Sequence, residues 1–333
     1  MRAIQIRHPG GLDQLQPVEQ DIPEPGPGQI RVRWHASSLN YHDLLVANGG
    51  IPVTDGRIPM SDGAGKIDAV SSDVTRWQVG DRVMSLFFPD WQEGRHHPER
   101  TAAVTGDTID GCACEYAVLA ENAVTPMPKN LSFAEAATLP CAGLTAWHAL
   151  MVRGKMQAGD TLLVQGTGGV SVIALQLAKA AGVSVIATTS SHAKGERLAA
   201  LGADHVINYA DNENWSRTVS KITGGGVDHV IDIGGAATLQ HSIAAARTSG
   251  HISLVGILGG VKANINVPMI FAKQLQVHGV AVGSAAMQND LTRAIEAGRI
   301  KPVIDSNFDL AQSAEAFSYQ TSARHFGKIT LSI

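Results

Sequence analysis

Thr161-Leu162-Leu163-Val164-Gln165-Gly166-Thr167-Gly168-Gly169-Val170-Ser171 joins a short apolar run to a glycine-rich turn. Residues 170–181 then carry apolar side chains at helical spacing, and a glycine at 182 ends the pattern. A strand, a glycine turn and a helix in this order predict a dinucleotide site, because Gly166 permits the tight turn and Gly168 lets the backbone approach a pyrophosphate. Ser171 departs from the usual Gly or Ala, and its hydroxyl is available to donate to phosphate. The predicted phosphate loop comprises Gly166, Thr167, Gly168, Gly169, Val170 and Ser171.

Strand-like and helix-like segments alternate along the rest of residues 143–282. The helix-like segments are 193–201, 214–222 and 238–247, and the strand-like runs are 184–188, 205–208, 230–233, 252–255 and 277–282. Such alternation predicts a parallel sheet with helices on both faces. The fold class is therefore α/β, with a doubly wound dinucleotide-binding domain over residues 143–282.

Residues 1–142 have a different pattern, with short strand-like runs such as 29–34, 65–70 and 115–119 separated by Gly and Pro. This pattern predicts a β-rich domain with few helices. We expect the chain to return to this domain after about residue 283, because residues 326–331 are again strand-like. The predicted domains are residues 1–142 with 283–333, and residues 143–282.

Composition limits the classes of function. The 333 residues are 44% hydrophobic and 17% charged with a net charge of −4, so we expect a large core and no role on nucleic acid or a membrane surface. No apolar run is long enough to span a bilayer, and the first seven residues lack the apolar core of a signal peptide. Three cysteines do not indicate a disulfide framework. We expect a cytoplasmic protein that acts on a small molecule.

The second strand of the dinucleotide domain indicates which cofactor is bound. An Asp or Glu at its end would hold a ribose 2′-hydroxyl, but residues 185–194 contain no acid. Hydroxyl and lysine side chains suit a 2′-phosphate instead, which favours NADP(H) over NAD(H). The alternative is that the two serines at 190 and 191 only cap the next helix. The candidate contacts are Thr189, Ser190, Ser191 and Lys194, and Tyr209, after the third strand, is expected to flank the adenosine.

Several motifs lie outside the glycine turn, at Asn40–Leu44, Gly63–Gly65, Val79–Val83, Ala136–Pro140, Leu201–Asp204 and Phe326–Ile329. With these motifs the chain resembles the medium-chain dehydrogenase/reductase superfamily over nearly its whole length. The branch it resembles is the zinc-independent quinone oxidoreductase-like one, whose members are often labelled zinc-type alcohol dehydrogenases. The resemblance implies a GroES-like catalytic domain, a Rossmann domain and a homodimer. It also implies that the cofactor is contacted by Thr145, Gly256, Ile257, Gly327 and Lys328.

Zinc enzymes of this superfamily hold the metal with a Cys, the His of a Gly-His-Glu motif and a second Cys. In this sequence Asn40 stands at the first position and Ser61 at the histidine, so only Cys141 remains. One cysteine and the displaced carboxylate of Asp62 make a poor zinc site. The cysteines of a structural zinc lobe are missing from residues 91–110.

A rival metal set consists of His96 and His97 with Cys112 and Cys114. Both cysteines fall on a predicted strand at 111–115, where packing as small apolar side chains is expected. We therefore expect no metal and no zinc.

The chemistry predicted without zinc is NADPH-dependent hydride transfer to an activated double bond or a quinone-like acceptor. Zinc polarises an alcohol or carbonyl oxygen, whereas the charge that develops on an enone or quinone oxygen can be held by hydrogen-bond donors. Asn40 and Tyr41 are the first candidates for such donors and His42 for a proton relay or ribose contact, although each also fits ordinary loop or core hydrogen bonding. Asp43 is expected to cap a helix that begins at Leu44.

The substrate pocket is expected to include Ser61, Phe87 and Cys141. Two other functions stay open. One is an NAD(P)-dependent alcohol dehydrogenase or aldehyde reductase, and the other is a cofactor-binding redox sensor with little turnover.

Overall fold

Thr145–Ala281 forms a parallel six-stranded sheet with strand order β10-β9-β8-β11-β12-β13. The chain starts in the middle of this sheet, runs to one edge and crosses back to build the other half, which is the doubly wound order of a dinucleotide-binding domain. The computed structural model describes all residues 1–333 and divides them into this unit and a second one, Met1–Leu144 with Val282–Ile333. The strands of the parallel sheet are β8 (Thr161–Gln165), β9 (Ser184–Thr189), β10 (His205–Asn208), β11 (Val227–Asp232), β12 (Ala246–Leu254) and β13 (Gln276–Gly279).

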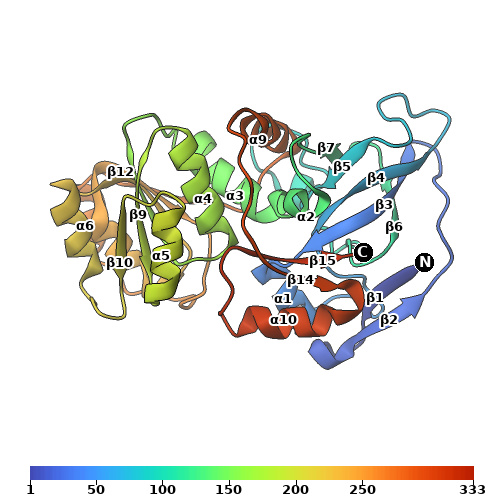
Figure 1. The fold of residues 1–333 in the computed structure, drawn as a ribbon, viewed down its shortest axis with the longest axis horizontal. Coiled ribbons are helices and arrows are strands. Elements are labelled where there is room, and N and C mark those ends of the chain that lie inside the picture. Colours follow the sequence, from blue (N-terminus) through green and yellow to red (C-terminus); the bar gives the residue numbers. More distant parts are fainter. The chain divides into compact units, whose positions relative to one another are not determined.

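Helices cover this sheet because its central strands are apolar on both faces (Figure 1). The first pair, α4 (Gly169–Ala180) and α5 (His192–Ala200), packs on β8, β9 and β10. The second pair, α6 (Trp215–Thr223) and α7 (Leu239–Ala245), packs together and against β11. Gly182 and Gly224 follow α4 and α6 with φ of 77° and 74°, a left-handed conformation that favours glycine at helix ends. A short helix, α8 (Val267–Ala272), precedes β13.

The other unit is built on a seven-stranded sheet with the path β14-β15-β3-β4-β5-β7, in which β6 also pairs with β3. Its long central strand, β3, places the fully buried Ile30, Val32 and Trp34 in the core. A separate two-stranded sheet joins β1 to β2. The strands are β1 (Arg2–Ile6), β2 (Leu15–Glu19), β3 (Gln29–Ser38), β4 (Asp62–Val70), β5 (Arg82–Ser85), β6 (Tyr116–Ala120), β7 (Val124–Pro126), β14 (Ile304–Asp309) and β15 (Lys328–Ser332).

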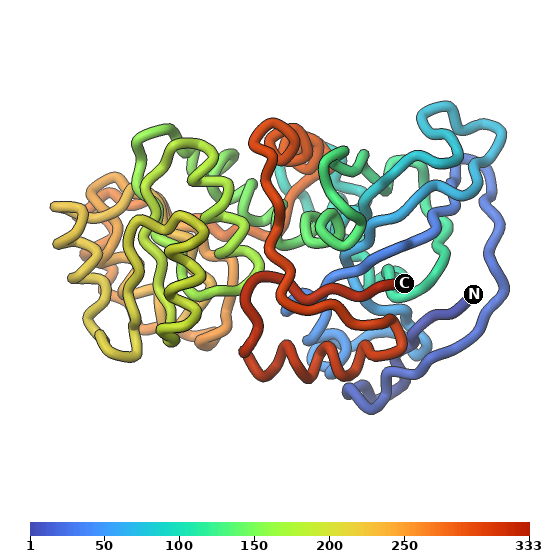
Figure 2. The backbone as a smooth tube through the Cα atoms, in the orientation of Figure 1, coloured from blue at the N-terminus to red at the C-terminus, as the bar shows by residue number.

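The carboxy-terminal segment completes this unit. Figure 2 shows the last strand, β15, beside β3, and Thr330, Leu331 and Ser332 pair antiparallel with Ser38, Ser37 and Ala36. This pairing brings Lys328, at the start of β15, next to the end of β3. The helices of the unit are α1 (Tyr41–Ala47), α2 (Phe133–Ala137), α9 (Ala285–Ala297) and α10 (Ser313–Thr321). A π-helical turn at Leu139–Gly143 follows α2. The chain then passes into the other unit through the α-helix α3 (Leu144–Trp147) and a second π-helical turn at His148–Arg153.

The predicted fold class is confirmed, with differences in detail. The structure divides the chain after Leu144 and Ala281, whereas the sequence prediction divided it after residues 142 and 282. The strand predicted at 277–282 ends at Gly279, and the strand predicted at 111–115 is wrong, because Cys114 forms only an isolated bridge to Ala3. The prediction also missed α9, which the Ser284 side chain caps, and α10.

Candidate functional site

The glycine turn has the geometry of a phosphate loop. Gly166 has φ of +70°, so any other side chain there would be strained. Gly168 has φ of −78° and ψ of 176°, and a Cβ added to it would meet no heavy atom within 4 Å. No side chain caps α4 at this residue, so the first N–H groups of a twelve-residue helix are left to bind an anion. The residues present therefore fit the pyrophosphate of a nicotinamide dinucleotide.

Ser171 has a different role from the one that the sequence suggested. Its side chain is 0% exposed and its hydroxyl donates to the carbonyl oxygen of Gln165 at 2.6 Å. A serine hydroxyl has one hydrogen to donate, and that hydrogen is used inside the protein. Ser171 thus ties the first turn of α4 to the end of β8, and the suggested donation from its hydroxyl to phosphate is not what the structure shows.

The end of β9 presents only part of the predicted 2′-phosphate set. The Ser191 side chain caps α5 by accepting the N–H of Lys194 at 3.4 Å, and the Thr189 hydroxyl, 2% exposed, lies within hydrogen-bond distance of Ser191. Ser190 and Tyr209 are exposed. Asp211, an acid that the sequence analysis did not identify, lies in the loop after β10. Its Oδ2 lies 3.1 Å from Nε2 of His192, the first residue of α5.

Asp232, at the end of β11, is a second buried group that sequence reasoning missed. Its carboxylate is 0% exposed and accepts the N–H groups of Gly234 and Gly235 and the hydroxyls of Thr238 and Ser242, at 2.6 to 3.1 Å. The ordered loop after β11 then binds the loop after β12 through backbone hydrogen bonds. The predicted carboxamide contacts, Gly256 and Ile257, lie in that second loop. An acid followed, after one residue, by two glycines at a strand end is the sequence signal that could have identified this site.

The other unit contains a buried polar cluster, here called the Asp62 cluster, made of Ser38, Asn40, Asp43, Ser61, Asp62 and Lys328. It lies where the end of β3, the start of α1, the start of β4 and the start of β15 meet. Asp62 Oδ2 accepts the Ser38 hydroxyl at 2.7 Å and Asn40 Nδ2 at 2.9 Å, while its Oδ1 has no hydrogen-bond partner. Lys328 Nζ lies 3.6 Å from Asp62 Oδ2.

Asp43 connects the cluster to α1. Its Oδ2 accepts the backbone N–H of Asn40 and its Oδ1 that of Ser61, both at 2.9 Å. The predicted cap is therefore corrected: the helix begins at Tyr41 and not at Leu44, its N-cap is Asn40, and Asp43 is the third helical residue, which closes a capping box with Asn40.

Electrostatics in the cluster are dominated by burial. Burial raises the pKa of Asp62 to about 6, with the Lys328 ammonium opposing the shift and the Asp43 carboxylate adding to it. Burial likewise raises the pKa of Asp43, against the attraction of His42. Burial and the Asp62 charge raise the pKa of the neighbouring Cys141 thiol well above its ordinary value. The cluster thus combines one ammonium with two carboxyls, beside a thiol whose pKa is raised.

This donor set does not fit a catalytic zinc. Zinc sites are built from thiolate, imidazole and carboxylate ligands. Asn40 offers an amide whose atoms are already bonded inside the cluster, and Ser61 offers a hydroxyl that is 0% exposed, so Cys141 is the one thiol among the three family ligand positions. A fixed ammonium near Asp62 also repels a cation. No group of three or more His, Cys, Asp or Glu side chains anywhere in the chain is arranged to hold a metal ion.

The start of α1 carries the other two predicted catalytic residues. Tyr41 is 41% exposed. His42 Nε2 lies 3.3 Å from Asp107 Oδ2, and its ring meets Phe87 edge-on with centroids 5.1 Å apart. Phe87 is 5% exposed and packs on Phe88. Asp107 is thus an acid near His42 that sequence reasoning missed, although Nε2 of His42 makes no hydrogen bond, while Tyr41 is accessible.

The two predicted cofactor contacts Gly327 and Lys328 have different surroundings in the structure. Gly327 has φ of +84°. Lys328 is 3% exposed, and its Nζ donates to the backbone oxygen of Leu39 and to Oδ1 of Asn40, both at 2.6 Å. Its ammonium is therefore bound within the Asp62 cluster. Thr145 is 5% exposed and Cys141 half-buried in the adjacent π-helical turn.

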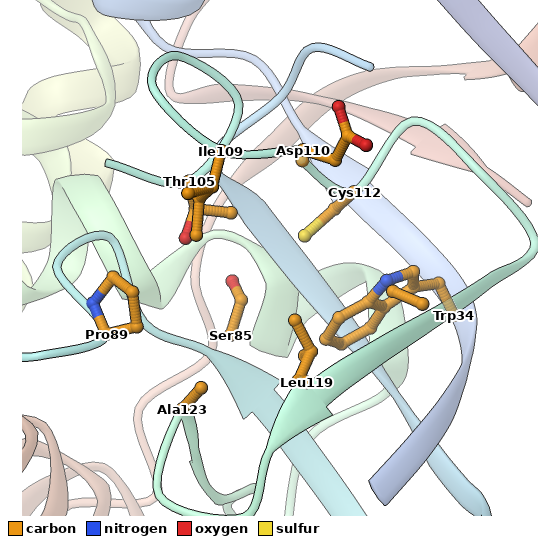
Figure 3. Close-up of a pocket in the computed structure, with 11 residues that line it drawn as sticks. Trp34, Ser85, Pro89, Thr105, Ile109, Asp110, Cys112, Leu119 and Ala123 are labelled. Carbon is orange, nitrogen blue, oxygen red and sulfur yellow. The ribbon is translucent and has the colours of Figure 1, made fainter. Parts of the chain in front are cut away.

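A small cavity lies beside β3 and β5. Its volume is about 10 Å³, close to that of one water. Figure 3 shows Trp34, Ser85 and Cys112 around it, with Thr105 and Ile109 at its other side. Burial raises the pKa of both the Cys112 and the Cys114 thiol. The cavity is too small for a substrate, and both thiols act as buried packing groups.

Comparisons with known proteins agree with this architecture. Residues 26–129 match the alcohol dehydrogenase GroES-like domain family and residues 169–297 match the zinc-binding dehydrogenase family. The chain is 42% identical to a zinc-type alcohol dehydrogenase-like protein of Schizosaccharomyces pombe, covering 97% of this chain and 96% of that protein. It is 32% identical to a quinone oxidoreductase of Pseudomonas aeruginosa, covering 99% of each.

Solved structures give the same result. A putative alcohol dehydrogenase from Sinorhizobium meliloti has a TM-score of 0.93 and 40% identity, covering 100% of this chain and 99% of that one. A mycobacterial protein solved in complex with NADPH has a TM-score of 0.83 and 26% identity, with 100% of each chain covered. A GroES-like domain joined to a Rossmann domain defines a class of two-domain oxidoreductases. Within that class, this chain belongs to the medium-chain dehydrogenase/reductase superfamily. None of its helices is long and apolar enough to cross a bilayer.

Proposed function

We propose that this oxidoreductase uses NADPH to reduce an activated carbon–carbon double bond or a quinone-like acceptor without a catalytic zinc. The observation that carries the proposal is the Asp62 cluster. In it, Asn40 donates to Ser61 and accepts from Lys328, and the Lys328 ammonium lies 3.6 Å from the Asp62 carboxylate. Such a site lacks the ligand set for a metal that would stabilise an alkoxide. NADPH supplies the hydride.

The preference for NADPH rests on the end of β9. Ser190 is exposed there, Lys194 lies in the first turn of α5, and Tyr209 is exposed after β10. No acid ends β9 to accept a ribose 2′-hydroxyl. The nearby Asp211 is paired with His192, which is a cation when protonated. These groups support binding of a 2′-phosphate over a free hydroxyl.

Proton delivery is assigned to the start of α1. Reduction of an enone places negative charge on the carbonyl oxygen, which needs a hydrogen-bond donor and then a proton. Asn40 does not serve as that donor, because both Nδ2 hydrogens face Ser61 and Asp62. Tyr41 is accessible, and His42 lies beside it with Nε2 3.3 Å from the Asp107 carboxylate. We infer that Tyr41 contacts the substrate oxygen, that His42 resupplies its proton, and that Phe87 and Cys141 border the substrate.

The test begins with cofactor titration. Binding of NADPH and NADH is measured by fluorescence, and a panel of quinones, enones, aldehydes and alcohols is then assayed with the tighter cofactor. Zinc is quantified in parallel on chelator-treated and untreated protein. We expect tighter NADPH binding, turnover of quinones or enones, and no loss of rate with chelator. Stoichiometric zinc whose removal abolishes alcohol or aldehyde turnover would establish the alcohol dehydrogenase reading instead. Tight NADPH binding with no turnover of any acceptor would establish a redox sensor.

We also propose that the enzyme is a homodimer. β13 pairs only with β12, so its other edge is unpaired. Exposed apolar side chains accumulate in the segment before it, and such patches mark interaction sites. A second copy that pairs at this edge would cover them. Light scattering after gel filtration should give about twice the 35.0 kDa chain mass, and a monomer would overturn the proposal. The exposed side chains are Ile257, Leu258, Val261, Val267 and Phe271.

A further inference from the structure

Lys328 is a buried charge with an unusually complete set of partners. Its side chain is 4% exposed, although lysine is rarely buried unless paired. Two of its hydrogens go to neutral oxygens immediately before α1, on Leu39 and Asn40, and its Nζ lies 3.6 Å from the carboxylate of Asp62. The desolvated ammonium is therefore compensated by hydrogen bonds and by an opposite charge.

These contacts determine which way the Asn40 amide faces. The amide oxygen accepts from Lys328, and the amide nitrogen donates to Asp62 at 2.9 Å and to Ser61 at 3.2 Å. A reversed amide would place its NH2 group against the ammonium and its oxygen against the carboxylate. Only one orientation is compatible with both neighbours. The same Asn40 begins α1, whose first two residues are Tyr41 and His42.

We propose that Lys328 is a positioning residue whose buried ammonium takes the place of a metal ion between Asn40 and Asp62, and so fixes the start of α1. The inference rests on the proposed function for its effect on turnover. It replaces the sequence-based expectation that Lys328 contacts the cofactor. The charged and titratable groups facing the ammonium come from separate elements: Asp62 from β4, Asp43 from α1 and Cys141 from the π-helical turn.

The test uses two variants and one control. Lys328→Met keeps the length of the side chain and removes the charge, and Lys328→Met/Asp62→Asn also removes the carboxylate that the ammonium compensates. The control is Lys301→Met, because Lys301 is also paired with a carboxylate, that of Glu135, at 3.3 Å, but is 55% exposed. Each protein is measured for NADPH affinity by fluorescence titration, for kcat, for Tm at pH 5 and pH 8, and for hydrogen exchange in the peptide covering residues 40–47.

Lys328→Met should lower Tm more at pH 8 than at pH 5, because Asp62 is protonated and neutral at the lower pH. The double variant should recover most of that Tm. It should still lose at least about tenfold in kcat and gain faster exchange in residues 40–47, because Asn40 Oδ1 has lost its donor. NADPH affinity should stay within about threefold of the original in both variants, a change too small to mark a lost phosphate contact. The control should change none of these quantities.

Two results would overturn the inference. If Lys328→Met weakens NADPH binding by about tenfold or more while kcat holds, the lysine is a cofactor ligand. If the double variant keeps both the kcat and the exchange rates of the unmodified enzyme, the lysine only balances the charge of Asp62. Hydrogen exchange needs no turnover, so it decides the role of Lys328 even if no acceptor is reduced. That last outcome would count against the proposed function alone.

Discussion

Gly168→Ala separates cofactor binding from folding at the glycine turn. Gly168 has φ of −78° and ψ of 176°, which any residue can adopt, and the new Cβ would meet no heavy atom within 4 Å. Alanine there narrows the unfolded ensemble, so the free energy of unfolding should stay the same or rise by about 0.4–1 kcal/mol. Unchanged or slightly higher stability is therefore the first expected result.

The same methyl group should weaken cofactor binding. Gly168 immediately precedes the N–H groups at the start of α4, and a Cβ there keeps a pyrophosphate from approaching them. A hydrogen bond to a charged group contributes about 1.5–3 kcal/mol, so losing one should raise the NADPH Kd by roughly 10- to 100-fold. Fluorescence titration measures the Kd, and thermal unfolding of the same samples measures stability.

Gly225→Ala is the matched control, since a Cβ there also meets nothing within 4 Å and the residue lies away from the turn. It should leave the Kd unchanged and, like Gly168→Ala, keep the free energy of unfolding the same or raise it slightly. An NADPH Kd for Gly168→Ala within about threefold of the original would refute the reasoning, since it would mean that the backbone at Gly168 does not approach the pyrophosphate.

Three further changes test other parts of the structure. Ser171→Ala removes a buried donor to Gln165 and should destabilise the protein by about 1–2 kcal/mol in urea unfolding with unchanged NADPH affinity. A higher NADPH Kd at unchanged stability would instead show that the Ser171 hydroxyl contacts a phosphate. Asp232→Ala leaves four donors without their acceptor and should cost about 3 kcal/mol or more by the same measurement; a cost under about 1 kcal/mol would show that the loop orders itself. Burial, with His278 and His229 adding, lowers the pKa of His251 to about 4. Unfolded histidine takes up a proton near pH 6.5 and folded His251 only near pH 4, so stability should fall by about 3 kcal/mol as pH drops through that window. His251→Phe should flatten this part of the pH–Tm curve, and an unchanged curve would assign the loss to other groups.

Local patterns explain why the dinucleotide-binding unit could be predicted. β8, the glycine turn and α4 are contiguous in sequence, and a glycine lies just beyond the end of each of α4, α5 and α6. Errors there were at element ends, as at β13, and at the short helix α8, which was not predicted. Cofactor contacts were harder to predict, because the role of a polar side chain depends on the group to which it hydrogen-bonds in the fold. Ser171 and Ser191 have the residue types of phosphate ligands but hydrogen-bond to the protein.

The Asp62 cluster could not be assembled from the sequence, because its members lie on four elements separated by up to 290 residues and meet only through strand pairing. Asn40 and Ser61 were found by their position in a family pattern. Lys328 was found too, but its pattern gave no sign of burial, since Gly-Lys at the start of a strand is equally compatible with an exposed side chain. Only the pairing of β15 with β3 places its ammonium beside Asp62.

The position of Lys328 also limits what its charge can do for catalysis. The ammonium has three hydrogens, of which two are donated to Leu39 and Asn40, and its nitrogen lies 3.6 Å from Asp62. A metal ion with an open coordination site can bind a substrate oxygen directly, whereas an ammonium surrounded by protein acceptors acts only through the groups that it orients. Polarisation of a substrate oxygen must therefore come from donors beyond the cluster. The nearest in sequence are Tyr41, which is accessible, and His42, whose Nε2 lies 3.3 Å from Asp107 Oδ2. Hydrogen-bond donors of this kind suit an oxygen that gains charge by conjugation more than an alcohol that must lose a proton before it reacts.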